Sequence, residues 1–342
     1  MSVLHLLGTS GDGGAETYFL DLVRALARAG VGEAVAMRRH AGREAALKAA
    51  GVPVKVLRFG GPVDILTRTA AAGYARLNRA QLALAWMNRA ARHTPKGPWA
   101  RVGRLGGYYN LKYYAGFDEL VANTEDIAEW VVNQGWPAGR VRYIPNFAEA
   151  PGDTAPVERA SLATPEGPPL LLAMGRLHES KAHDIALRAL VQLPDAWLWI
   201  AGAGPEEARL KAMATALGVE RRTRFLGWRT DASALYRSAD VCVFPSRYEP
   251  LGNVVIQAWA HGLPVVAAAS QGPRALIDPG KDGLLVPIDD ADALAEGVRA
   301  LLADAALRAA LAQRGRERVA LEFSEAAVVG QWKQLFADYG AG

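Results

Sequence analysis

Short apolar runs alternate along this chain with glycine-containing turns and with segments of helical periodicity, and this rhythm most constrains the fold. Residues 3–7 are apolar, residues 8–14 hold four glycines, and leucine, valine and alanine then recur at helical spacing as far as Gly30. Two further apolar runs, 34–37 and 54–57, are separated by another helical segment. Strands that alternate with helices predict parallel βαβ units with right-handed crossovers.

The alternation is interrupted around residues 149–168, where prolines and glycines cluster as they do in interdomain linkers. A second series of apolar runs and turns begins at residue 170. A chain of 342 residues also exceeds what one ordinary core holds. The sequence therefore predicts an α/β protein with two doubly wound, Rossmann-like domains, residues 1–160 and 168–323, which face each other across a cleft.

Cysteine content and hydropathy bear on the cellular compartment. Cys242 is the only cysteine, which excludes an internal disulfide and fits a reducing compartment. It lies in the apolar run 239–244, where we interpret it as a small core residue rather than a nucleophile. Residues 3–7 are too short for the apolar core of a secretory signal, and no apolar run approaches the length of about 20 residues that a membrane span needs. We therefore expect a cytoplasmic protein that is soluble or peripheral to a membrane.

The positive charge is concentrated in the first half of the chain. Residues 1–165 carry 20 Lys and Arg against 14 Asp and Glu, although the net charge of the whole chain is only +4. No acidic residue occurs between Asp64 and Asp118, and the basic residues of this stretch are Arg68, Arg76, Arg79, Arg89, Arg92, Lys96, Arg101, Arg104 and Lys112. The stretch is either a solvated basic face or a patch for an anionic partner, namely a lipid surface, a phosphorylated acceptor or nucleic acid.

Aromatic residues are interleaved with this basic stretch. They are Tyr74, Trp86, Trp99, Tyr108, Tyr109, Tyr113 and Tyr114. Because aromatic rings favour the membrane–water interface, the composition favours a membrane surface. No recognisable nucleic-acid-binding module accompanies the stretch, so nucleic acid is not expected as a partner.

Two strand-to-helix turns carry residues suited to a phosphorylated ligand. The first reaches its helix at Gly13 and Gly14, where the backbone can approach a ligand closely and helix N–H groups are free for an anion. The second, just after the apolar run 170–173, contains Gly175, Arg176 and Lys181. Two cations five residues apart suit a diphosphate whose charge grows as the leaving bond breaks, although two ordinary surface cations remain the alternative.

A third turn, within residues 244–259, is the most informative. A strand ends there, a loop carries Glu249, and a helix begins near Asn253, so that its first amides form a second phosphate site. Gln257 follows about one helical turn later on the same side. The sequence Asp-Ala-Asp at 290–292 has the form of a metal-binding pair, but it opens a helix, and we interpret it as a cap.

Taken together, seven motifs in order resemble the retaining GT-B glycosyltransferases of family four, over nearly the whole chain. The motifs are Gly-Gly-Ala-Glu at 13–16, Gly-Arg-Leu at 175–177 with Lys181, Gly-Ala-Gly-Pro at 202–205, Phe-Leu-Gly at 225–227, Pro-Ser at 245–246 with Glu249, Gly-Leu-Pro-Val-Val-Ala at 262–267, and Asp-Gly-Leu-Leu-Val-Pro at 282–287.

The resemblance implies roles for individual residues. Arg176 and Lys181 would hold the donor diphosphate, and Glu249 would meet the transferred sugar. Backbone amides near the third turn would contact sugar and phosphate, and the residues after Gly227 would lie beside the base. The donor-binding residues implied are Gly14, Gly175, Trp228, Arg229, Leu251, Gly252, Asn253, Val254 and Gln257. Transfer in this family proceeds with retention, the departing phosphate takes the acceptor proton, and neither a metal nor a cofactor is expected.

Two positions depart from the family pattern. The family commonly has a second Glu eight positions after the first, where it binds ribose hydroxyls, and this chain has Gln257. An amide still hydrogen-bonds hydroxyls, so donor binding should survive. The family also often has a histidine after a late strand of the first domain, whereas residues 101–109 contain none. Arg104 or Tyr108 replaces it on the acceptor side, or the role is absent; His93 is expected at the surface.

These inferences lead to one main functional prediction. The chain is expected to transfer a sugar from a nucleotide-sugar donor to a saccharide or lipid-linked acceptor of the cell envelope, in lipopolysaccharide or exopolysaccharide biosynthesis. The first domain would bind the acceptor, the C-terminal helix 324–342 would pack back on that domain, and the protein would attach to the inner face of an anionic membrane. A GT-B sugar-nucleotide epimerase and a non-catalytic nucleotide- or sugar-binding module are the alternatives.

Overall fold

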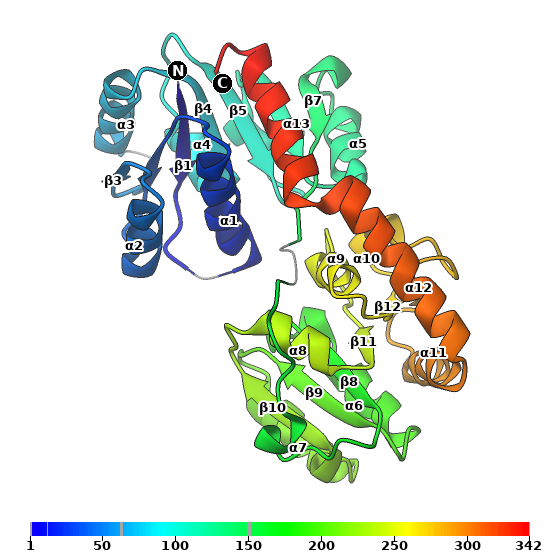
Figure 1. Cartoon of the computed structure of the whole chain (residues 1–342). Coiled ribbons are helices and arrows are strands. Elements are labelled where there is room, and N and C mark those ends of the chain that lie inside the picture. Colours follow the sequence, from blue (N-terminus) through cyan, green and yellow to red (C-terminus); the bar gives the residue numbers. More distant parts are fainter. Residues whose placement is uncertain (1, 12, 62–63, 149–151, 342) are drawn as a thin grey trace. The chain divides into compact units, whose positions relative to one another are not determined.

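The computed structural model describes residues 2–11, 13–61, 64–148 and 152–341, which divide into two compact units (Figure 1). Unit 1 comprises Met1–Asn146 together with Glu325–Gly342, and unit 2 comprises Phe147–Ser324. The predicted end of the first domain at residue 160 is therefore too late.

The proline-rich segment belongs to unit 2 because it packs there. The backbone N–H of Val157 donates to Ser238 Oγ at 2.8 Å, and the Arg159 guanidinium donates to the Ser238 carbonyl at 2.7 Å. The indole N–H of Trp199 donates to the Thr164 hydroxyl at 2.9 Å. Prolines keep this segment out of helices and strands but do not prevent it from packing on a domain.

Unit 1 contains, among its described residues, a seven-stranded parallel sheet in the order β3-β2-β1-β4-β5-β6-β7. Its strands are β1 Ser2–Leu7, β2 Glu33–Met37, β3 Val54–Val56, β4 Ala80–Trp86, β5 Ala100–Leu105, β6 Glu119–Ala122 and β7 Val141–Tyr143. Strands β2, β4 and β6 are almost wholly buried, because helices cover both faces of a parallel sheet. Such strands read as continuous apolar runs, which is the pattern that predicts them.

The helices of unit 1 are α1 Gly14–Arg28, α2 Ala41–Ala49, α3 Ile65–Leu77, α4 Met87–His93, α5 Glu125–Asn133 and α13 Glu325–Asp338, with short 3₁₀ turns η1 Leu111–Tyr114 and η2 Ala138–Arg140. Helix α1 contacts α2 and α13, whereas α3 contacts α4. The C-terminal helix α13 is thus part of unit 1, as the sequence predicts. Its Trp332 is fully buried, and Asp338 forms an ion pair with Arg142 at 2.9 Å.

Unit 2 contains, in the part that is described, a six-stranded parallel sheet in the order β10-β9-β8-β11-β12-β13. The strands are β8 Leu170–Met174, β9 Trp197–Ala201, β10 Thr223–Gly227, β11 Val241–Phe244, β12 Val265–Ala268 and β13 Leu284–Val286. The predicted α/β class with two parallel-sheet, Rossmann-like domains is confirmed.

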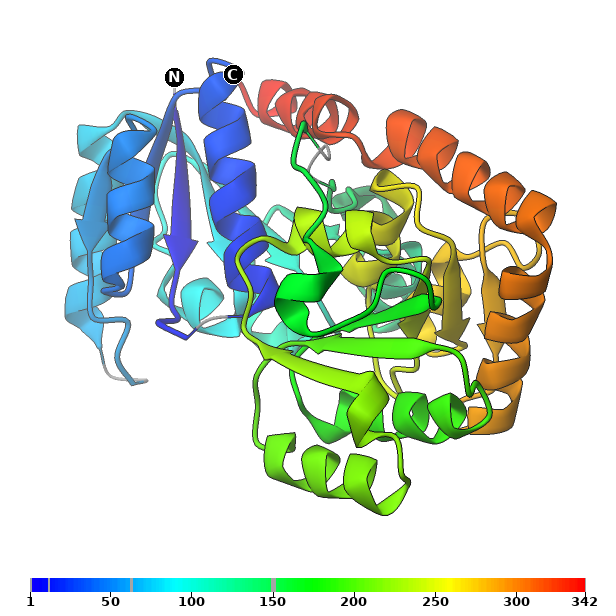
Figure 2. The same ribbon diagram turned by 60° about the horizontal axis from the view of Figure 1, so that its bottom comes forward.

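The helices of unit 2 are α6 His183–Val191, α7 Glu207–Ala216, α8 Ala232–Ser238, α9 Asn253–Ala260, α10 Gln271–Leu276, α11 Ala291–Ala303 and α12 Ala305–Arg318. Shorter helical turns are η3 Arg159–Leu162, η4 Glu179–Lys181, η5 Glu220–Arg222 and the π-turn η6 Val319–Phe323. Helices α11 and α12, orange in Figure 2, pack against each other, and α11 contacts β12 and β13.

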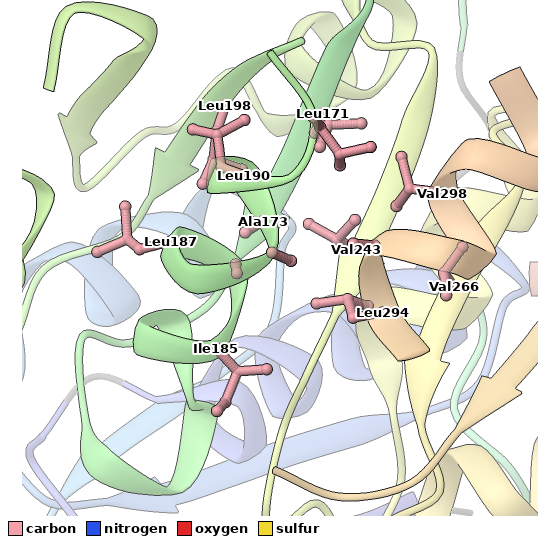
Figure 3. Close-up of a cluster of buried hydrophobic side chains, with 14 of the residues drawn as sticks. Leu171, Ala173, Ile185, Leu187, Leu190, Leu198, Val243, Val266, Leu294 and Val298 are labelled. Carbon is pink, nitrogen blue, oxygen red and sulfur yellow. The ribbon is translucent and has the colours of Figure 1, made fainter. Parts of the chain in front are cut away.

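One core of unit 2 lies between its sheet and helices α6 and α11 (Figure 3). Leu171 of β8, Val243 of β11 and Val266 of β12 meet Leu187 of α6 and Leu294 of α11, all of them nearly inaccessible. The core fixes the strands, and therefore also the loops that leave their carboxyl ends. Cys242 is fully buried, and burial raises the pKa of its thiol to about 12, which confirms its interpretation as a core residue.

None of the described helices combines the length and the apolar character that crossing a bilayer requires.

Candidate active site

The loops after β8 and β9 are packed backbone against backbone. Gly202 has φ +154°, and a Cβ placed on it would lie 1.9 Å from the Gly175 carbonyl oxygen. A Cβ on Gly204 would lie 2.3 Å from the Leu177 carbonyl oxygen. The N–H of Leu177 in turn donates to the Ala203 carbonyl at 3.0 Å. Only glycine permits so close an approach, which explains the two glycines of the loop after β9.

The two predicted cations, Arg176 and Lys181, follow this edge of the sheet and lie in different environments. Arg176 is exposed, and its guanidinium has no hydrogen-bond or ion-pair partner among the described residues. Lys181, at the end of η4, forms an ion pair with the Glu249 carboxylate and lies 5.8 Å above the Phe244 ring. Gly175, with φ +147°, lies against the aliphatic part of Lys181. One cation is therefore free to meet a ligand, and the other already has a counter-charge.

Glu249 is held from both sides of its carboxylate. One oxygen pairs with Lys181, and the other accepts the backbone N–H groups of Gly252 at 3.2 Å and, more weakly, of Leu251 at 3.4 Å. The Glu249 carbonyl accepts the N–H of Gly272 at 2.7 Å. The side chain is only 14% exposed, so the loop between β11 and α9 presents the carboxylate in one orientation.

Helix α9 begins directly after this carboxylate. Its N-cap Gly252 has φ +92° and supplies no side-chain cap to the first amides. Asn253, Val254 and Gln257 are the half-buried residues of the helix, and its other residues are buried. The structure therefore places Gln257 on the same helix face as Asn253, as helical periodicity predicts.

Arg247 organises the site but is absent from the sequence-based prediction. Its guanidinium binds Asp184 through two bonds, of 2.7 and 3.0 Å, and reaches Asp289 at 2.5 Å. It also donates to the Glu179 carbonyl at 2.9 Å. Burial would raise the pKa of Asp184, but the hydrogen bonds and charge of Arg247 outweigh burial and lower it. Arg247 thereby ties η4, which carries Lys181, to the loop that carries Glu249. Its position inside the 244–259 motif is the signal that would have identified it.

The loop after β10 carries the two residues expected beside a base. Trp228 is 65% exposed, an unusual exposure for so large an apolar ring. Arg229 makes two bonds to Asp231, of 2.7 and 2.5 Å, so its guanidinium is already engaged. The exposed indole of Trp228 offers a face on which a base can stack. The guanidinium of Arg229 is less available to a ligand than the sequence suggested, because Asp231 binds it.

The glycine turn of unit 1 leads into α1. A Cβ on Gly14 would meet no atom within 4 Å, so packing within the protein does not require glycine there. Gly13, by contrast, approaches Glu16, whose carboxylate accepts the Thr9 hydroxyl at 2.5 Å. The buried guanidinium of Arg43 donates to the carbonyls of the turn. Since packing within the protein does not explain the glycine at position 14, close approach of a ligand is consistent with it.

Arg104 is buried inside unit 1, and Tyr108 is half-buried. Arg104 is 3% exposed, donates to the Asn146 side chain, and lies about 5 Å from the ring centres of Tyr18 and Trp86. Burial lowers its pKa from the ordinary value. Tyr108 donates its hydroxyl to Asp126 and packs edge-to-face on a tryptophan. Arg104 is therefore an internal anchor with almost no accessible surface, and we do not retain it as an acceptor-binding residue.

The expectation that His93 lies at the surface is wrong. His93 is 1% exposed, with Nε2 3.2 Å from the Gly60 carbonyl and its ring edge-on to Phe59. Burial lowers its pKa. The helical segment containing it is short, and its polar end folds inward to cap the loop that contains Gly60.

A pocket of about 670 Å³ lies at the carboxyl ends of β2 and β3, and sequence analysis did not predict it. Its basic lining consists of Arg38, Arg39 and Arg58, and Ser10 of the glycine turn contributes to its wall. None of the three arginines has a carboxylate partner in the described part of the chain. Two adjacent arginines directly after a predicted strand were the available signal. The pocket is suited to an anionic ligand of unit 1.

The Asp-Ala-Asp sequence behaves as a helix cap. The Asp290 carboxylate accepts the N–H of Ala293 at 2.8 Å and thereby caps α11. Asp292 accepts a hydrogen bond from Gln192 at 2.5 Å. The first carboxylate is therefore used in the way that the sequence interpretation proposed.

Comparisons with known proteins agree with this arrangement. The profile of the family described as "Glycosyl transferases group 1" matches residues 155–318. The chain is 38% identical to the lipopolysaccharide core biosynthesis glycosyltransferase LpsE of Rhizobium meliloti, over 95% of this chain and 96% of that protein. It is 34% identical to LpsD of the same organism, over 98% of each. Among solved structures, HepE of Anabaena in complex with UDP has the same fold, with a TM-score of 0.87, 21% identity, and coverage of 99% of this chain and 100% of that one.

Proposed function

Because the chain belongs to the group 1 glycosyl transferases, we propose that it transfers a sugar from a nucleotide-sugar donor to a saccharide or lipid-linked acceptor in envelope polysaccharide biosynthesis. The near full-length similarity to two lipopolysaccharide core transferases supports this role. The epimerase and binding-module alternatives are not favoured, since both of these relatives are transferases. The observation that carries the proposal is the grouping of Arg176, Lys181 and Glu249 at the carboxyl edge of the unit 2 sheet.

In the proposed reaction, the bond between the anomeric carbon and the donor phosphate breaks as the acceptor oxygen bonds to the same face of the sugar. The acceptor proton passes to the departing phosphate oxygen. Negative charge grows on the diphosphate, and the cations of Arg176 and Lys181 stabilise that charge in proportion to its growth. Glu249, fixed by the amides of Leu251 and Gly252, orients the sugar, and configuration is retained.

We propose that no metal ion is required, since two cations supply positive charge beside the diphosphate. Trp228 would stack on the base, and Gln257 would hydrogen-bond ribose hydroxyls. UDP is the first nucleotide to test, because a protein of the same fold binds it. Turnover that survives EDTA would support the metal-free mechanism, and turnover restored only by added divalent cations would exclude it.

For the acceptor, we propose the pocket of Arg38, Arg39 and Arg58 in unit 1, which suits an anionic saccharide. This assignment replaces Arg104, which is buried. Comparison of acceptors with and without a phosphate group tests this assignment. Arg39→Gln should raise the KM for the phosphorylated acceptor and leave the KM for the unphosphorylated acceptor unchanged.

We further propose peripheral attachment to the inner face of an anionic membrane through residues 68–112 and their surroundings. The prediction that aromatic residues of this stretch meet a membrane surface is wrong for Trp86, Trp99 and Tyr114, which are buried and at most 5% exposed. Exposed apolar side chains come from α3 instead, where Ile65, Leu66 and Leu77 are 72–77% exposed. Flotation with liposomes of varied anionic lipid content, at low and high salt, tests the attachment.

The central experiment measures transfer of a labelled sugar from a panel of nucleotide sugars, with and without acceptor. Arg176→Ala and Lys181→Ala should each lower catalysis by about 2–4 kcal/mol and weaken nucleoside diphosphate binding more than nucleoside binding. Equal losses for the two ligands would show that the cations do not touch phosphate. Release of free sugar without an acceptor requirement would refute transfer.

A further inference from the structure

Unit 1 has a second basic pocket, of about 570 Å³, which the proposed reaction does not use. It lies among α3, the end of α4, the start of β5 and the segment around η1, and α3 and α4 are neighbours in the fold (Figure 1). It shares no lining residue with the arginine pocket at the ends of β2 and β3. Its basic lining consists of Arg68, Arg76, Arg92, Lys96, Arg101 and Lys112.

The lining of this pocket is charged with one sign only. It includes no Asp or Glu, and none of the six cations has an ion-pair partner within the described ranges. Two half-buried arginines elsewhere in the chain are neutralised, by contrast: Arg142 pairs with Glu119 and Asp338, and Arg318 pairs with Asp282 and Glu322. Gathering uncompensated like charges around one concavity is unfavourable without an anion.

These cations are held in place by groups that carry no negative charge. Arg68 donates to the Arg92 carbonyl at 2.7 Å, and Arg101 donates to the Gly116 carbonyl. Arg92 lies 4.7 Å from the centre of the Tyr113 ring and donates to its hydroxyl at 2.9 Å.

Lys112 lies 5.1 Å from the same ring. The hydrogen bond from Arg92 lowers the pKa of Tyr113, in keeping with a positive environment. The arrangement thus positions the guanidinium groups but leaves their charge available.

Apolar side chains border this pocket on the same helix. Arg68, Thr69, Ala72 and Arg76 of α3 line it. Ile65, at the start of that helical face, is 72% exposed, and Leu77 beside Arg76 is 77% exposed. Cations that surround a cavity, with exposed apolar residues at its rim, match a lipid whose phosphate enters the pocket while its acyl region meets the apolar side chains.

We propose that this pocket binds the phosphate headgroup of an anionic membrane lipid. The inference deepens the proposed membrane attachment and rests on it, but it is independent of sugar transfer. It turns a diffuse electrostatic attraction into a defined site, which discriminates between lipids that present the same charge in different headgroups.

The test uses the full chain and replaces three exposed cations of the pocket that form no ion pair within the described ranges, in the triple variant Arg76→Gln, Lys96→Gln, Lys112→Gln. The matched control removes three exposed cations of unit 1 outside the pocket: Arg24→Gln, Lys48→Gln, Lys55→Gln. Both variants lose the same charge, and both should keep the wild-type unfolding temperature. Flotation is measured with phosphatidylcholine vesicles alone and with phosphatidic acid or phosphatidylserine at fractions that give the two kinds of vesicle equal surface charge.

We expect wild type to bind phosphatidic acid vesicles better than phosphatidylserine vesicles, and the pocket variant to lose binding about tenfold or more while the control loses little. Pyrophosphate should compete with the vesicles. Equal losses for the two triple variants, or no preference between the two anionic lipids, would overturn the proposal. A wild-type protein that is stabilised by pyrophosphate but never floats would overturn the lipid as the source of the phosphate. Transfer to a soluble acceptor, measured in parallel, should be unchanged in the pocket variant, so failure of this site is separable from failure of the proposed reaction.

Discussion

Replacement of Glu249 by Gln separates the two functions of its carboxylate. The amide oxygen of Gln still accepts the N–H groups of Leu251 and Gly252, which the carboxylate accepts at 3.4 and 3.2 Å. The change removes the negative charge that now neutralises Lys181. Because the two side chains are only 24% and 14% exposed, water screens the ion pair only partly, and its loss should cost about 1–3 kcal/mol, a fall in unfolding temperature of about 2–12 °C.

The two functional readouts should move in opposite directions. We expect transfer to fall by a factor of about 10²–10³, the range for loss of one group that acts at the reacting centre. Nucleoside diphosphate should bind at least several-fold more tightly, since about 1 kcal/mol or more of competition for Lys181 disappears. Steady-state transfer with a labelled donor gives the first quantity, and titration calorimetry with UDP gives the second.

The control is Glu207→Gln, which breaks an exposed ion pair with Lys211 in the same unit and should change neither quantity. Transfer by Glu249→Gln at the wild-type rate would refute the assignment of Glu249. Weaker UDP binding would refute the idea that Glu249 competes for Lys181, and would mean that it positions the lysine instead.

Three further predictions concern the scaffold of unit 2. Gly202→Ala places a Cβ 1.9 Å from the Gly175 carbonyl oxygen, so urea titration should show a loss of about 2–4 kcal/mol, whereas Gly167→Ala, in open space, should show none. Burial lowers the pKa of His183 from 6.5 to about 4, so that, as the pH falls, the unfolded chain takes up the proton before the folded chain does. The contribution of His183 to the free energy of unfolding is therefore complete above pH 6.5 and declines by up to about 3 kcal/mol towards pH 4. His183→Gln should lack this decline. Arg247→Lys keeps the charge but not the paired bonds to Asp184, so turnover should fall about tenfold, while Arg209→Lys at an exposed pair should have no effect.

The local pattern of the chain was sufficient to predict the two units and the strand-end loops that carry Lys181 and Glu249. Apolar runs such as 170–173 predict buried parallel strands, because both faces of such strands meet helices. Glycines at 175 and 202 predict tight strand-end loops, and the structure shows a positive φ at both and, at Gly202, a backbone contact that leaves no room for a side chain. Ion pairing of Lys181 with Glu249, 68 residues later, follows from two strand ends at one sheet edge.

Errors arose where burial, rather than pattern, decided the outcome. Composition made Arg104, His93, Trp86 and Trp99 look like surface residues of a basic, aromatic stretch, yet each is buried. A side chain's accessibility depends on what packs over it from distant segments; Arg104, for example, is covered by Tyr18 and by Asn146.

The sequence by itself determined the α/β class and the two-unit organisation, because period, turn composition and motif order are local properties, and it supplied the residues that we propose for phosphate chemistry. Only the tertiary structure decided which cations are available. Arg176 is free, Arg229 and Arg247 are engaged by carboxylates, and the cations lining the pocket of α3, α4 and η1 have no counter-charge in the described chain. Charge is a property of a residue, but its neutralisation depends on which distant residue the fold brings within a few ångströms.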